Sequence, residues 1–163
     1  MKVLLTGFEP FDGSKLNPSL LVVEAFPYEQ FSSHSIKKMI LPVDSSSAVD
    51  LVRKTLSEVQ PDLVIHLGEA SNRPVISLEK VAINWMDFRI ADNTGAQIKD
   101  QKIIESGPDA YFSSLPLRQI RDALRSDSIP VEVSLSAGAY LCNQVFYSSL
   151  YFIDQFRMST ICG

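Results

Sequence analysis

Short apolar runs and longer amphipathic segments alternate along most of the chain. Runs of about four to eight residues rich in apolar and β-branched side chains predict buried strands, and such runs occupy 2–6, 36–43, 62–68 and 129–135. Apolar positions that recur with helical spacing predict helices over 18–26, 45–60, 117–126 and 141–156. This alternation indicates an α/β fold. We expect a single-domain α/β/α sandwich over residues 1–163, in which helices cover a mixed, mostly parallel sheet.

The segments between these elements carry further signals. Asn17 can cap the first helix and Asp44 the second, because both side chains accept hydrogen bonds from helix-start N–H groups. Residues 75–85 alternate between apolar and polar positions, as a strand does. Residues 95–109 are polar and rich in turn formers, so we expect a surface excursion there.

The composition narrows the classes of function. The 163 residues are 45% apolar, and 15 basic against 19 acidic side chains give a net charge of −4. This balance argues against binding to nucleic acid or to a membrane surface, since both favour a basic face. No apolar run approaches the roughly 18 residues of a membrane span, and no basic and apolar leader opens the chain. We therefore expect a cytoplasmic protein with a small-molecule or peptide ligand.

Cysteine and histidine are too few to suggest a disulfide framework or a metal site. Cys142 and Cys162 lack metal-ligand spacing, and only His34 and His66 could add ligands. His66 lies inside an apolar run, where a hydrogen-bonded core histidine is more common than a catalytic base. The glycine fingerprint of a nucleotide site is also absent. We expect neither a metal nor a cofactor.

Cys142 is the first candidate for chemistry. It falls in the first turn of the predicted helix 141–156, just after a strand and the small residues of 136–138. Unpaired N–H groups at a helix start favour negative charge, so they could lower the thiol pKa below its usual value of about 8.5 and hold an oxyanion. The alternative is that Cys142 is a small buried apolar side chain, which is the commoner case.

Two aromatic residues and one acid also admit a structural and a functional interpretation. Phe8 and Phe11 flank a loop after the first strand, and either they pin that loop to the core or they wall a flat apolar pocket. Glu79 stands in a mostly apolar strand-like segment. Either it turns to solvent or pairs with a basic residue such as Lys80 or Arg89, or it takes part in chemistry.

Four motifs, in order along the chain, resemble those of the pyroglutamyl peptidase I family, a family of cysteine peptidases. They are Gly7-Phe-Glu-Pro-Phe11, Ser77-Leu-Glu-Lys-Val-Ala-Ile-Asn84, Phe88-Arg-Ile-Ala-Asp-Asn93 and Ser136-Ala-Gly-Ala-Tyr-Leu-Cys-Asn143. The resemblance covers nearly the whole sequence. It implies the removal of N-terminal pyroglutamate from peptides, without a cofactor, by a protein that we expect to form homo-oligomers.

The resemblance also implies roles for particular residues. Cys142 would be the nucleophile, and Glu79 would be the acidic member of a Cys-His-Glu triad that orients the histidine. The rings of Phe8 and Phe11 would sandwich the pyrrolidone ring, and Arg89 matches an arginine that the family keeps near the active site. The residues that would complete the substrate pocket are Asn17, Glu69, Tyr140 and Leu141.

The sequence departs from the family pattern in two ways. The family's histidine lies further along than the 21 residues that follow Cys142 here. General acid–base catalysis contributes about 10² to 10⁴ in rate, so we expect this chain to be nearly inactive and the native gene product to be longer. Glu69 stands where the family has glutamine, and its charge would repel the carbonyl of the substrate ring.

These departures leave a second function open and carry a structural consequence. The alternative function is a catalytically silent protein that binds pyroglutamyl peptides or serves as a scaffold. A chain that stops within a strand would leave a sheet edge and the apolar helix 141–156 uncovered, so we expect self-association.

Overall fold

The structure is a computed structural model that describes residues 1–71 and 73–163. Its strands are β1 (Lys2–Phe8), β2 (Ser35–Leu41), β3 (Leu63–His66), β4 (Ile76–Glu79), β5 (Val81–Ile83), β6 (Ala110–Phe112), β7 (Val131–Ser134) and β8 (Ile161–Cys162). Its helices are α1 (Pro18–Ala25), α2 (Ser47–Val59), α3 (Leu117–Ser126) and α4 (Leu141–Gln155), with a short 3₁₀ turn η1 (Tyr28–Phe31). The predicted strands and helices are confirmed, with ends that shift by a few residues. The strand expected over 75–85 is divided into β4 and β5, and β6 has no signal in the pattern.

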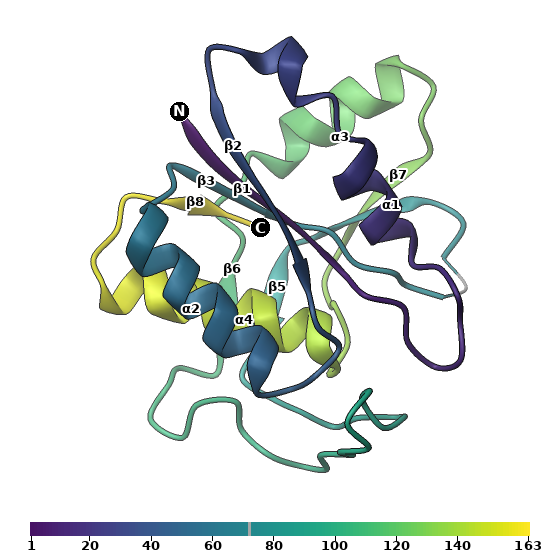
Figure 1. Cartoon of the computed structure of the whole chain (residues 1–163), viewed down its shortest axis with the longest axis vertical. Helices are drawn as coiled ribbons and strands as arrows, with labels where there is room; N and C mark the ends of the chain where they lie inside the picture. Colours follow the sequence, from purple (N-terminus) through teal and green to yellow (C-terminus); the bar gives the residue numbers. More distant parts are fainter. Residues whose placement is uncertain (72) are drawn as a thin grey trace.

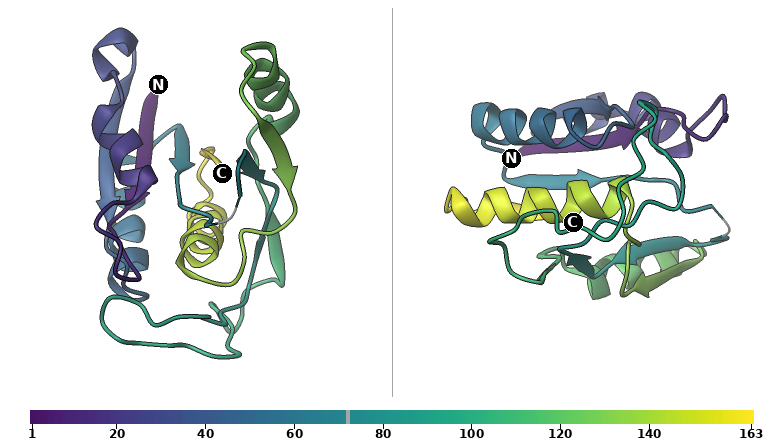
Figure 2. Two further views of the ribbon diagram at one scale, coloured as in Figure 1. Left: turned by 90° about the vertical axis from the view of Figure 1, so that its right-hand side faces the viewer. Right: turned by 90° about the horizontal axis from the view of Figure 1, so that it is seen from below.

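The strands form a mostly parallel arrangement. β2, β1, β3 and β8 make a parallel sheet in that order, β4 and β7 make a parallel pair, and β5 and β6 make an antiparallel pair. Figures 1 and 2 show α1 and α3 on one side of the strands and α2 and α4 on the other. Parallel neighbours need crossover connections, which the helices supply. The predicted α/β/α fold class is confirmed.

The main core lies between the central strands and the pair formed by α2 and α4. Helix α4 is buried along most of its length, from Leu141 to Ile153, as its apolar composition predicts. Helix α2 is amphipathic and turns Val52 and Leu56 inward. This packing fixes the start of α4, and therefore Cys142, against the sheet.

Side-chain hydrogen bonds fix the loops that surround this core. The Asn17 side chain accepts a hydrogen bond from the Ser19 N–H at 2.9 Å, so the predicted cap of α1 is confirmed. Asp44 instead accepts from the Ser46 N–H at 3.0 Å, one turn before α2 begins, and therefore orders the approach to the helix. Buried Asn84 accepts from the Ile104 N–H at 2.9 Å and so anchors the irregular segment 95–109.

The described residues contain neither a membrane span nor a metal-binding cluster. None of the helices there combines the length and apolar character that crossing a bilayer requires. The same residues contain no cluster of three histidine, cysteine or acidic side chains that could hold a metal ion.

Candidate active site

Cys142 lies at a sharp corner between β7 and α4. Gly138 turns the chain there with φ +81°, a conformation that residues with a Cβ rarely adopt. No side chain caps the start of α4, so the N–H groups of its first turn are not engaged by a capping side chain. The predicted strand-to-helix corner is therefore present, with its backbone donors beside the thiol.

A cavity of about 530 Å³ lies in front of this corner. It runs between β3 and β4 and reaches α1, α3 and α4 at its walls. Four of the predicted site residues line it: Phe8, Glu69, Glu79 and Cys142. The structure therefore brings the candidate nucleophile, the candidate acid and one of the two aromatic rings to one cavity.

The thiol pKa differs from the sequence expectation. Burial, together with the charges of Glu79 and Glu69, raises the pKa of Cys142 to about 11, although a backbone N–H acts in the opposite direction. The expectation of a lowered pKa is therefore wrong for these residues as they stand. Removal of water and nearby negative charge both penalise a thiolate, and here they outweigh the helix start.

Glu79 uses only one of its two oxygens. Its Oε1 accepts from Arg73 Nη1 at 2.7 Å. Its Oε2 is buried and receives no hydrogen bond from any described residue. A buried carboxylate oxygen normally has a donor, so this side of Glu79 is an open acceptor that faces the cavity region.

Arg73 is the site residue that sequence reasoning missed. It lines the cavity, and besides Glu79 it donates to the Ser136 carbonyl at 3.0 Å. It thereby ties the β3–β4 connection to the corner before Cys142. The expected partners of Glu79 were Lys80 or Arg89, but Lys80 lies over the Phe112 ring and Arg89 is exposed. A single basic residue in an irregular loop offers no sequence signal for this pairing.

The predicted aromatic residues Phe8, Phe11 and Tyr140 pack against the core or against each other, and Phe8 also lines the cavity. Phe8 is 4% exposed and belongs to the core, yet it also lines the cavity. The ring centroids of Phe11 and Tyr140 lie 6.1 Å apart. The Tyr140 ring packs edge-on against Phe88, with 4.7 Å between the ring centroids. The Tyr140 hydroxyl donates to the Ala91 carbonyl at 3.1 Å. Phe11 and Tyr140 thus form an aromatic cluster outside the cavity lining.

The remaining predicted pocket residues also lie outside the cavity lining. Leu141 is buried in the core, and Arg89 is exposed. Asn17 is fully buried, and its amide holds the first loop by donating to the Glu9 carbonyl at 3.1 Å. Their roles toward a substrate remain predictions.

Gly68 explains how closely the chain approaches the thiol. A Cβ at this position would lie 2.6 Å from Cys142 Sγ, which is closer than atoms can pack. A side chain at position 68 would therefore have to displace the sulfur from its place beside the chain.

Neither histidine is placed as a free base. His66 lines the cavity, but its Nδ1 pairs with Thr6 Oγ1 at 2.7 Å and its Nε2 with Ser149 Oγ at 2.9 Å. Burial lowers its pKa to about 4. This confirms the expected hydrogen-bonded histidine in the sheet. His34 is exposed beside Ser33, outside the cavity lining.

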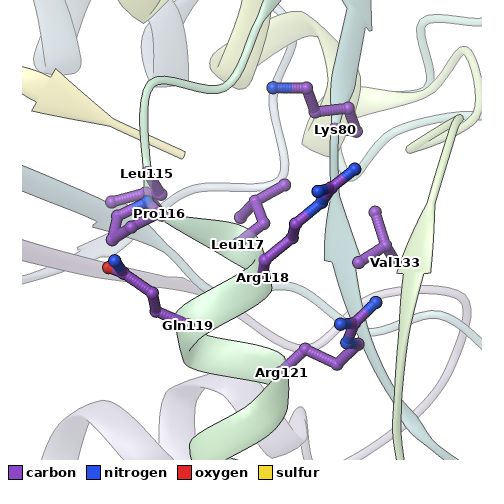
Figure 3. A pocket seen from close by; sticks show the side chains of 8 residues that line it. All are labelled: Lys80, Leu115, Pro116, Leu117, Arg118, Gln119, Arg121 and Val133. Atoms are coloured by element: carbon purple, nitrogen blue, oxygen red, sulfur yellow. The ribbon is translucent and has the colours of Figure 1, made fainter.

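A second hollow of about 590 Å³ lies between α3 and the β4–β7 pair (Figure 3). Its rim carries Lys80, Arg118 and Arg121, and its apolar lining includes Leu117 and Val133. None of the predicted site residues lines it, although Leu115 and Leu117 line both hollows.

The fold and the cavity define an α/β protein in which a cysteine at a helix start and a carboxylate share one cavity, the elements of a thiol hydrolase. The model of the family described as pyroglutamyl peptidase matches residues 1–163. The chain belongs to the pyroglutamyl peptidase family.

Curated relatives and solved structures agree with this assignment. The pyrrolidone-carboxylate peptidase of Pyrococcus furiosus is 44% identical over 151 residues, which are 93% of this chain and 73% of that protein. The Thermococcus onnurineus protein of the same name is 45% identical over 163 residues, which are 100% of this chain and 81% of that protein. A crystal structure of a mutant P. furiosus pyrrolidone carboxyl peptidase matches with a TM-score of 0.96 at 40% identity, covering 100% of this chain and 78% of that one.

Proposed function

We propose that this site serves the removal of N-terminal pyroglutamate from peptides, with Cys142 as nucleophile and Glu79 as the acid that orients an imidazole. Membership of the pyroglutamyl peptidase family and the names of the relatives support the substrate class. The shared cavity supports the choice of residues. The imidazole is the member that neither His34 nor His66 supplies.

The chemistry would proceed through a thioester. An imidazole takes the proton from Cys142 Sγ, and the thiolate attacks the pyroglutamyl carbonyl carbon while N–H groups at the start of α4 bind the oxyanion. The imidazolium then gives its proton to the leaving amine as the C–N bond breaks. Water hydrolyses the thioester, releases pyroglutamate and restores the thiol. Glu79 would hold the imidazole in the correct tautomer throughout.

The open oxygen of Glu79 is the observation that carries the proposal. Glu79 Oε2 is buried without a donor among the described residues, in a cavity that also contains Cys142. An imidazole N–H is a suitable donor for this oxygen. The same ring would give the Cys142 thiol a base and a positive neighbour, whose charge would oppose the burial and the negative charges that raise the thiol pKa.

The test is hydrolysis of a fluorogenic pyroglutamyl amide by three proteins. They are the 163-residue chain, its Cys142→Ser variant, and a version extended through Phe-Ile-His with the closing helix of the family. We expect activity only in the extended version, and we expect the 163-residue chain to be nearly inactive. Activity in the short chain that Cys142→Ser abolishes would mean that His34, His66 or a neighbouring subunit provides the base.

A second candidate function is a silent pyroglutamyl-binding protein. The thiol pKa of about 11 favours it, because few thiols would then be ionised at neutral pH. Titration with a pyroglutamyl aldehyde separates the two functions. A reactive Cys142 forms a reversible hemithioacetal, whereas a passive pocket binds the aldehyde without a covalent adduct.

A further inference from the structure

The guanidinium of Arg73 joins groups from two distant parts of the chain. Its Nη1 donates to Glu79 Oε1 at 2.7 Å and to Ser134 Oγ at 3.3 Å, and its Nη2 donates to the Ser136 carbonyl at 3.0 Å. Glu79 is 6 residues away in the sequence, whereas Ser136 is 63 residues away. A planar guanidinium presents its N–H groups in fixed directions, so one side chain can hold two partners in a set relation to each other.

The two serines that Arg73 contacts shape the corner between β7 and α4. The Ser134 hydroxyl accepts from the Ser136 N–H at 3.2 Å and donates to the Ser136 carbonyl at 3.1 Å. The Ser136 hydroxyl accepts from the Gly138 N–H at 3.1 Å. Gly138 then turns the chain, with φ +81°, toward the helix start that carries Cys142. The Ser136 carbonyl thus accepts from a hydroxyl within the corner and from Arg73 outside it.

Arg73 also acts on the charge and the orientation of the acid. Among the described residues that line the cavity, it alone carries a positive charge at neutral pH, because burial lowers the pKa of His66 to about 4. It therefore offsets the charge of Glu79, which is one of the causes of the raised pKa of Cys142. The side chains of Arg73 and Glu79 are 35% and 22% exposed, so water screens part of this attraction. The fixed geometry of the pair matters as much as its charge.

We propose that Arg73 is a positioning residue, which holds the Glu79 carboxylate by one oxygen and, through the Ser136 carbonyl, sets the corner that presents Cys142. One side chain thereby keeps β4, which carries the acid, aligned with the start of α4, which carries the thiol. Lysine cannot replace it, because a single nitrogen lacks the fork that reaches both partners at once. The effect of Arg73 on hydrolysis rests on the proposed function, and its effect on the corner and the thiol does not.

Thiol reactivity in variants of the 163-residue chain tests the effect on the acid. Arg73→Met removes the charge and the donors at similar length, and Arg73→Lys keeps the charge on one nitrogen. Arg118→Met is the matched control, because Arg118 is exposed on α3. We expect iodoacetamide alkylation of Cys142 at pH 8 to slow about threefold to tenfold in Arg73→Met. It should slow less in Arg73→Lys and should not change in the control.

Amide solvent exchange, measured by NMR, tests the effect on the corner. We expect exchange at the Ser136 and Gly138 N–H groups to become about threefold faster or more in both Arg73 variants. Glu79→Gln should not have this effect, because it leaves the bond from Arg73 to Ser136 in place. Exchange within α2 should stay the same in all variants, whereas a general loss of stability would raise it too.

Hydrolysis of a pyroglutamyl amide by the extended version tests the effect on the reaction. We expect Arg73→Met to lower kcat about tenfold or more with KM changed less than twofold, and Arg73→Lys to recover part of kcat. A raised KM with unchanged kcat, unchanged alkylation, unchanged exchange at Ser136 and Gly138, or faster exchange in α2 as well would each overturn the positioning role. The expected alkylation and exchange, without hydrolysis by the extended version that retains Arg73, would overturn the peptidase function alone.

Discussion

Individual ionisable side chains in this protein take their properties from what surrounds them. Cys142 sits at a helix start, a position that favours the thiolate, yet burial and two carboxylates raise its pKa to about 11. His66 has an ordinary imidazole, yet burial between β1 and α4 lowers its pKa to about 4. Desolvation penalises the charged form of both groups. It therefore raises the pKa of the thiol and lowers the pKa of the imidazole.

Replacing Glu79 with glutamine should make Cys142 more acidic. The substitution removes a negative charge that raises the thiol pKa and leaves Arg73 without its carboxylate partner. We expect iodoacetamide alkylation at pH 8 to become about threefold to tenfold faster, with Cys142→Ser as the background for Cys162. Glu58→Gln on the exposed face of α2 is the matched control. An unchanged or slower rate for the Glu79 variant would contradict this account.

His66 should make the fold less stable in mild acid. An unfolded histidine with a pKa near 6.5 binds a proton that the buried ring, with a pKa of about 4, does not. Stability that is present above pH 6.5 is therefore lost as the pH falls toward 4, by about 1 to 2 kcal/mol between pH 7 and 5. Urea unfolding at both pH values measures it. His66→Gln, which can still bond Thr6 and Ser149, should lose less stability over this interval, and an equal loss would rule out His66 as the cause.

At the scale of elements, the corner that carries Cys142 is held by side chains that bond to backbone. Asn143 donates to the carbonyls of Ile83 and Trp85 at 2.9 and 3.1 Å and accepts from the Ile83 N–H at 2.9 Å. It thus joins the first turn of α4 to β5. Arg73 makes the corresponding connection from the β3–β4 segment to the residues before α4.

Truncating Asn143 should destabilise the protein by about 2 to 4 kcal/mol, because Asn143→Ala leaves partly buried backbone groups of Ile83 and Trp85 unpaired. Urea denaturation at pH 7 measures the loss. Asn93→Ala is the matched control, since Asn93 is exposed and its amide donates to the Pro10 carbonyl alone among the described residues. A loss for Asn143→Ala no larger than that of the control would show that its three hydrogen bonds do not stabilise the corner.

For the whole molecule, the hollow that contains Cys142 lies between β3 and β4. Exposed apolar side chains border it, including Val22 and Ile76, which are 52% and 47% exposed. Open edges and apolar surface promote association with further chains. The expected homo-oligomer therefore remains a prediction with a structural reason.

Charging this surface should weaken self-association. We expect the 163-residue chain to show concentration-dependent oligomers in sedimentation velocity, and Val22→Lys with Ile76→Lys to lower the association constant about tenfold or more. Leu16→Lys is the control, because Leu16 is 60% exposed but does not line the cavity. A monomer at all concentrations, or an equal effect of the control, would show that this surface does not drive association.

The sequence by itself determined the order and type of nearly all elements, because apolar periodicity reports which face of each helix or strand is buried. It also determined the cysteine corner, the cap at Asn17 and the four family motifs. The tertiary structure alone decided that Arg73 pairs with Glu79, that one oxygen of Glu79 stays open, and that the Cys142 pKa rises. Distances between loops far apart in the chain and the exclusion of water set these properties, and neither leaves a pattern in the order of residues.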